Sequence, residues 1–186
     1  MRVTSLVVAL VATLALALPT PASIQAMDLG QLMTATSKTI HGTITAREVV
    51  KLAHPWPDAV YTQLTITGEN ARTGEREQVK VLFHGSHDAR DQYTISEMPT
   101  LQDTRVGSEV IAFYSPRKDM EGRHLLSNLG GVFRVERAFG QPVVLGKGQG
   151  FAFEKNEKLQ VARDRIRVMH LELLKFKQQQ SLAPAK

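Results

Sequence analysis

The sequence predicts a mainly β domain, a small closed β-barrel of five to six strands, with a short helix before it and an amphipathic helix after it. Between Thr39 and Val144, short runs rich in Val, Ile, Thr, Tyr and Phe alternate with Gly, Asp, Asn and Pro, as strands and turns do. Helical periodicity is confined to the two flanks. Closure is expected because it removes the unpaired strand edges of a flat sheet; a β-sandwich is the alternative.

The first 26 residues have the features of an export signal. Arg2 precedes an uncharged, largely apolar run, Val3–Leu18, whose 16 residues are fewer than the ~20 of a membrane-spanning helix. We predict a signal peptide at 1–26, cleaved after Ala26 or, as second choice, after Ala22. No integral membrane segment is expected after cleavage, and an uncleaved membrane anchor is the alternative.

The composition fits one exported domain. Removing those 26 residues from the 186 leaves 160, enough to bury a core, and the absence of cysteine means that burial acts without disulfides. This favours a bacterial protein, periplasmic or extracellular, and we expect a monomer. The net charge is +5, but from residue 154 onward eight basic residues stand against four acidic ones. Because this excess is terminal and lacks interleaved aromatic residues, nucleic acid is not a predicted partner.

The elements follow in order. Residues 27–38 are expected to form a short helix and lead-in, capped by Asp28, and residues 39–153 the β-barrel domain. In the first strand, Gly42 predicts a bulge or a close backbone approach. In the third, Val79, Val81 and Phe83 alternate with Lys80, Leu82 and His84, so His84 should face away from the core.

The second half of the domain is less regular. A polar connection at 86–105 is expected to hold a short helix or an extra strand, because its 20 residues are too many for a hairpin loop. Apolar segments at 106–116, 122–137 and 141–150 supply the remaining strands.

An amphipathic helix is predicted at 154–180, followed by a disordered tail at 181–186. Its apolar stripe follows helical spacing and consists of Leu159, Ala162, Ile166, Met169, Leu173 and Phe176. We expect the stripe to pack across an open end of the barrel; docking on anionic lipid or on a partner is the alternative.

Several motifs together resemble a known group of proteins. They are Ser37, Ile40, Gly42 and Ile44 in the first strand, Tyr61-Thr62 opening the second, and the segments VKVLFHG, VGSEVIAFY and GGVFRV. This order resembles uncharacterised bacterial exported proteins with an oligonucleotide/oligosaccharide-binding (OB)-like β-barrel, which are distantly similar to netrin and tissue-inhibitor-of-metalloproteinase modules.

The resemblance covers about Ser37–Glu136 and implies an OB-like barrel, export and no known catalysis. The animal inhibitors bind the protease zinc through an N-terminal cysteine, and this chain has none, so that mechanism does not carry over. Fold alone does not establish function.

The stretch FHGSHDARD, residues 83–91, is the strongest chemical candidate. His84, His87 and Asp88, with His124 brought near by the fold, would offer nitrogen and oxygen ligands to a transition metal. The other interpretation is the polar end of a strand. The chain has no Gly-x-Ser-x-Gly elbow, and GKGQG at 146–150 lacks the residues of a phosphate loop. We therefore assign no catalytic, cofactor-binding or metal-ligating residue.

The predicted function is an exported, non-catalytic binding or interaction module for an unknown protein or glycan partner. The alternative is a metal-dependent or other hydrolase, its site assembled from distant strands around His84/His87. A deep pocket gathering His41, His84, His87 or His124 beside carboxylates would favour the hydrolase, and a shallow hydrophobic face the binding module.

Overall fold

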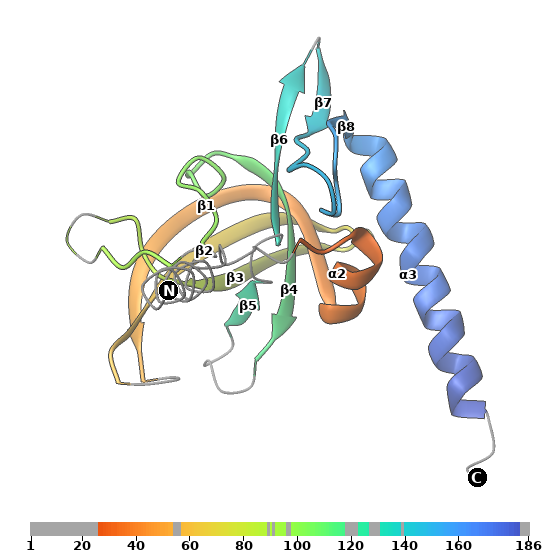
Figure 1. Ribbon diagram of the computed structural model, residues 1–186, viewed down its shortest axis with the longest axis horizontal. Helices are drawn as coiled ribbons and strands as arrows, with labels where there is room; N and C mark the ends of the chain where they lie inside the picture. The colour runs from red at the N-terminus through yellow and green to blue at the C-terminus, as the bar shows by residue number, and fades with distance from the viewer. Residues whose placement is uncertain are drawn as a thin grey trace, which may run out of the picture.

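The structure is a computed structural model that describes residues 26–53, 57–88, 90, 92–95, 98–117, 123–126, 131–138 and 140–182. These residues form a barrel, a sheet extension on one side and two helices (Figure 1). The elements are α2 (Leu29–Ala35), β1 (Lys38–Leu52), β2 (Ala59–Asn70), β3 (Arg76–His84), β4 (Glu109–Pro116), β5 (His124–Leu126), β6 (Val132–Ala138), β7 (Gln141–Val144), β8 (Glu157–Lys158) and α3 (Leu159–Leu182).

Five strands close the barrel in the order β1-β2-β3-β5-β4 and back to β1. The β1–β2, β2–β3, β1–β4 and β4–β5 pairs are antiparallel, whereas β3 and β5 run parallel, with Val81 opposite His124. The predicted OB-like closed barrel is thus confirmed. Beyond the ring, β4 also pairs with β6, β6 pairs with β7, and β7 pairs with β8, so the sheet continues away from the barrel.

Two paired glycines let β1 and β2 approach closely, as Gly42 predicted. A Cβ on Gly42 would lie 2.4 Å from the Thr67 carbonyl oxygen, and one on Gly68 would lie 2.1 Å from the His41 carbonyl oxygen. Such distances are far below van der Waals contact, so this crossing requires glycine on both strands. The bulge lies three residues beyond Gly42, at Thr45, where the β1–β2 register shifts.

Alternation along the strands produces two large cores, besides a small cluster of Ala59, Tyr61 and Leu82. One lies inside the barrel and contains inward residues of all five ring strands, among them Ile40, Ile44 and Leu64. The other lies outside, where Ile111 and Phe113 of β4 point away from the barrel. Because these outward side chains are apolar, that face must be covered.

The two helices provide the cover. Asp28 caps α2 with a reciprocal capping box, as predicted, and Leu29, Leu32 and Met33 are buried. Leu159, Ala162 and Ile166 of α3 join the outer core. The predicted stripe therefore packs beside α2 over the outer face of β4 and β6, and the expectation that it crosses an open end of the barrel was wrong (Figure 1).

The connection between β3 and β4 is irregular over its described part. It contains one isolated bridge, between Ser86 and Tyr93, and turns near Leu101–Thr104, with no helix among its described residues. Met98 packs against the barrel interior. The connection therefore covers part of an open end of the barrel, where the C-terminal helix was expected to pack. Helix α3 begins at Leu159, and its last described residue, Leu182, lies two beyond the predicted end at 180.

Candidate functional site

The two histidines of the predicted metal loop have different surroundings. His84 lies on the outer face of the barrel, its ring centroid 5.1 Å from that of Tyr61 and 5.2 Å from that of Tyr93. The His87 Nε2 atom lies 2.9 Å from the Pro99 carbonyl oxygen. Asp88 accepts a hydrogen bond from the Arg90 backbone N–H at 3.0 Å. These contacts order the loop without converging on a common point, and Asp91 lies outside the described residues.

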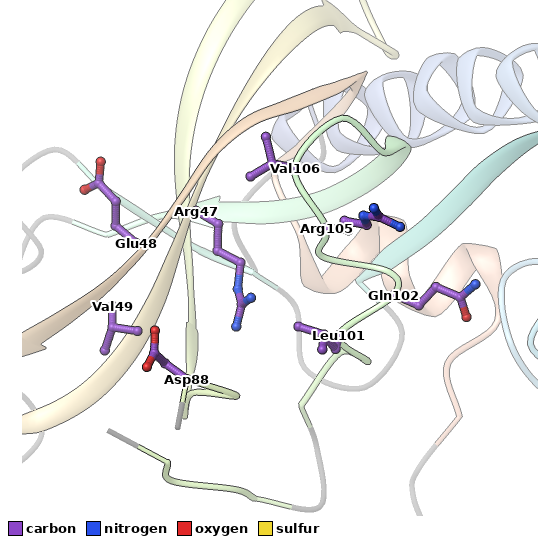
Figure 2. A pocket seen from close by; sticks show the side chains of 8 residues that line it. All are labelled: Arg47, Glu48, Val49, Asp88, Leu101, Gln102, Arg105 and Val106. Carbon is purple, nitrogen blue, oxygen red and sulfur yellow. The ribbon is translucent and has the colours of Figure 1, made fainter. Parts of the chain in front are cut away.

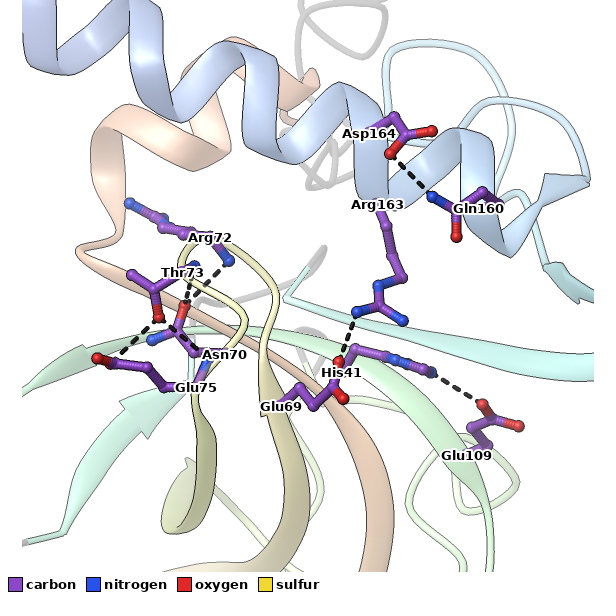
Figure 3. A network of polar contacts seen from close by, with 10 residues as sticks. All are labelled: His41, Glu69, Asn70, Arg72, Thr73, Glu75, Glu109, Gln160, Arg163 and Asp164. Carbon is purple, nitrogen blue, oxygen red and sulfur yellow. Dashed lines mark hydrogen bonds and ion pairs between the residues drawn. The ribbon is translucent and has the colours of Figure 1, made fainter.

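The other two histidines lie elsewhere. The His124 ring packs at 5.1 Å from Tyr114, and the His41 Nε2 atom is 2.8 Å from Glu109 on the outer face (Figure 3). Within the described ranges, no group of three or more His, Cys, Asp or Glu side chains is placed to hold a metal ion. The fold therefore does not assemble the metal constellation that the sequence suggested.

A pocket of about 710 Å³ lies where the second half of β1 faces the β3–β4 connection (Figure 2). We call it the Arg47 pocket. None of the four histidines lines it. Its lining consists of Arg47, Glu48, Val49, Asp88, Leu101, Gln102, Arg105 and Val106.

Strand register directs Arg47 into this pocket. Arg47 pairs with Leu64 and Val49 with Thr62, and both partners are buried and face the barrel interior. Residues paired across antiparallel strands share a face, so Arg47 and Val49 point to the inner side at the barrel mouth. Glu48 points to the opposite face, as Figure 2 shows, and its carboxylate accepts a hydrogen bond from Gln63 at 3.3 Å.

The pocket is chemically mixed, with a basic centre. Arg47 Nε is buried and has no hydrogen-bond partner in the described part of the chain. Arg105 stands on the facing wall, while Leu101 and Val106 are each 53% exposed. Asp88 contributes one carboxylate. The Arg47 guanidinium beside exposed apolar side chains fits a ligand that presents an anionic group and some apolar surface.

Sequence reasoning did not find Arg47, because strict alternation from Ile44 would direct the Arg47 side chain to the outer face. The bulge at Thr45 inverts that alternation, so Arg47 faces the side on which Ile44 lies. One signal was present: after the regular TIHGTI, the run REVV breaks the period of two at Val49-Val50.

A second polar cluster lies at another end of the barrel and has a structural role. Tyr114 donates a hydrogen bond to Glu77 at 3.0 Å, and burial raises the pKa of Tyr114. Arg72 donates to the Thr36 carbonyl oxygen and to Thr39, both at 3.0 Å, and burial lowers the pKa of Arg72 to about 10. The two Arg72 bonds tie the end of α2 and the start of β1 to the β2–β3 turn, which Figure 3 shows beside α3.

The outer side of α3 carries exposed apolar residues. Arg163 forms an ion pair with Glu69, which fixes the start of the helix to β2 (Figure 3). Phe176, the last residue of the predicted stripe, is 57% exposed. A shallow depression of about 390 Å³ beside Leu29 and Met169 lies along this helix. Among the described residues, no helix is both long and apolar enough to cross a membrane.

Comparison with protein-family models, with curated proteins and with solved structures finds no match for this chain. The resemblance to exported OB-like proteins and to netrin and tissue-inhibitor modules therefore stays a prediction based on the quoted motifs. Interpretation of function depends on the site itself.

Proposed function

We propose that this protein is an exported, non-catalytic binding module that holds an anionic group of a protein or glycan partner in the Arg47 pocket. One observation carries the proposal: a guanidinium directed into a pocket, its buried Nε–H without a hydrogen-bond partner among the described residues. An unsatisfied buried donor costs about 1–3 kcal/mol, so a side-chain position that brings this N–H to a ligand acceptor in the pocket is favoured. Carboxylates suit guanidinium groups best, because the two can form parallel hydrogen bonds.

The hydrolase hypothesis around His84/His87 has less support. His84 packs against two tyrosines and His87 bonds to a backbone carbonyl, while the described pocket beside β1 contains neither. A hydrolytic site would require these groups to converge on a substrate.

Binding can be tested by calorimetry with two acidic ligands, oligogalacturonate and poly-glutamate, against the neutral maltohexaose and poly-glutamine. We expect an acidic ligand to bind and Arg47→Gln to weaken it at least about ten-fold, which is the loss of one charge-assisted bond. Arg137→Gln is the matched control, because Arg137 is exposed on β6 and does not line the pocket. The proposal fails if neither acidic ligand binds, or if both arginine variants bind as the wild type does.

Export is tested separately, because the signal peptide at 1–26 lies almost entirely outside the described residues. Expression of the full chain in a bacterium, followed by fractionation and mass spectrometry, should yield a protein that begins at Met27 in the periplasm or medium. An intact N-terminus in the cytoplasm would contradict this part of the proposal.

A further inference from the structure

We propose that the partner enters the Arg47 pocket as an extended acidic peptide that adds a strand to an open edge of β1. This inference rests on the proposed function and goes further, because it selects a protein segment over a glycan and predicts how the segment is held.

The open edge arises where β1 leaves β4. Pairing between β1 and β4 runs from Lys38 to Thr43. Ile44 then bonds to the connection: its N–H donates to the Ser108 carbonyl at 3.0 Å, and its carbonyl accepts from Gly107 N–H at 2.8 Å. Beyond Ile44, β1 pairs only with β2 among the described residues. The edge of β1 that faces away from β2 lies beside the Arg47 pocket.

The register determines which backbone groups face the pocket. Ile44 directs both of its groups away from β2, and the bulge at Thr45 places Ala46 opposite Thr65. Antiparallel strands alternate between residues that bond to the partner and residues that bond away from it. Arg47 and Val49 therefore direct their N–H and carbonyl groups towards the pocket, and no hydrogen bond from these groups to another described residue is found.

Such an edge is a template for strand addition. Charged residues on an edge strand are also a usual protection against aggregation, and Glu48 fits that role. This edge differs because a pocket lies directly beside it and because Arg47 is directed into that pocket. A glycan could satisfy the guanidinium group, but it lacks the regular series of amide donors and carbonyl acceptors that the edge matches.

Side chains on the edge predict the partner's pattern. A residue opposite Arg47 should be acidic, since the Arg47 guanidinium is directed into the pocket and Glu48 points away. A residue opposite Val49 should be apolar, because Asp88 near Val49 would repel a second carboxylate (Figure 2). Val49 lies two residues beyond Arg47, so the partner carries an acidic and an apolar residue two positions apart on one face.

The test uses a capped heptapeptide, Thr-Val-Thr-Glu-Thr-Val-Thr, whose symmetric order fits either strand direction. Two N-methylated forms serve as controls, one blocked at the Val and Glu amides and the other at the Thr amides. Only one of these sets can face β1, so we expect one form to bind at least about ten-fold more weakly and the other to bind like the parent. Affinities come from NMR titration of the purified protein, which also reports amide exchange at Arg47 and Val49.

Variants of Val49 test the same edge from the protein side. Val49→Pro removes a backbone donor that faces the pocket, at a type of position where edge strands tolerate proline. We expect it to weaken peptide binding at least about ten-fold, whereas Val49→Ala, which keeps the N–H, changes binding less than about three-fold. Bound peptide should also slow hydrogen exchange of the Arg47 and Val49 amides.

The outcomes separate the two proposals. If both N-methylated peptides bind like the parent while Arg47→Gln abolishes binding, strand addition is wrong and the anionic site stands. If oligogalacturonate binds and the heptapeptide does not, the partner is a glycan and strand addition is again wrong. If the heptapeptide, oligogalacturonate and poly-glutamate all fail to bind, the proposed function fails as well.

Discussion

The two halves of β1 differ in how they are held. The first half, Lys38–Ile44, pairs with β4 as far as Thr43 and with β2 from Ile40 onward, and it places Ile40 and Ile44, both fully buried, in the barrel interior. The second half, Ala46–Leu52, pairs with β2 in every described pairing, and its residues are half-buried or exposed. The bulge at Thr45 separates them.

The difference shows how one strand can serve both stability and recognition. Residues with neighbours on both sides can bury apolar side chains and satisfy both sets of backbone groups within the domain. Residues with a neighbour on one side keep donors and acceptors for a partner, and local stability is lower where fewer contacts are made. We therefore expect substitutions in the first half to affect folding and those in the second half to affect binding.

Ile40→Ala should produce the largest effect. Ile40 is fully buried in the barrel interior, and removing its side chain leaves a cavity that costs about 2–5 kcal/mol of unfolding free energy. Val49→Ala, in the second half, should cost about 1 kcal/mol, since a half-buried valine contributes about half of the 1.5–3 kcal/mol of a fully buried one. Urea unfolding measures both, and equal losses would contradict the division of β1.

Proline substitutions at neighbouring positions come next. Val50 pairs with Tyr61, and the alternation places its N–H towards β2, so Val50→Pro should cost on the order of 2–4 kcal/mol. Val49→Pro removes a donor that faces the pocket and should cost less than about 1 kcal/mol. If the two variants had equal melting temperatures, or if Val49→Pro were the less stable, the assignment of the open edge would be wrong.

Gly42→Ala tests the close approach in the first half. The added Cβ would lie 2.4 Å from the Thr67 carbonyl oxygen, which belongs to the backbone and cannot rotate away. The strands must separate, at a cost of about 1–3 kcal/mol. Thr43→Ala, at an exposed position on the same strand, is the control. Unfolding midpoints that were the same for both variants would show that β1 and β2 adjust without strain.

Local sequence patterns were sufficient for much of the fold. Asp28, followed by three apolar residues at helical spacing, predicted α2 and its cap, because capping depends on a few neighbouring residues. Alternating residues predicted β3, including the outward position of His84. Gly42 predicted the close approach because only glycine leaves room for a facing backbone.

The Arg47 pocket could not be predicted in the same way. It depends on a one-residue shift at Thr45 and on where a connection distant in sequence, with Leu101 and Arg105, comes to lie. Neither follows from local propensity. The position of α3 could not be predicted for a related reason: Ile111 and Phe113 lie in a strongly apolar strand, and such a strand does not indicate which of its two faces a helix covers.

The smallest expected effect is a pH dependence shared between the two halves. The charge of Lys38, at the start of β1, acts on His124. His84 pairs with Tyr61, and Tyr61 pairs with Val50 in the second half of β1. Burial lowers the pKa of both histidines, and for His124 the charge of Lys38 lowers it further. The unfolded chain therefore takes up these protons first as the pH falls below about 6.5, and the folded state loses stability from there down to the lower folded pKa values.

Unfolding measured at about pH 7.5 and about pH 5 should show this loss in the wild type and a smaller loss in His84→Gln and in His124→Gln, with the smallest loss in the double variant. The effect is modest because both rings keep solvent contact, and His170, whose pKa is also lowered by burial, adds a remainder that neither substitution removes. A double variant that lost as much stability as the wild type would show that the acid response of the barrel arises elsewhere.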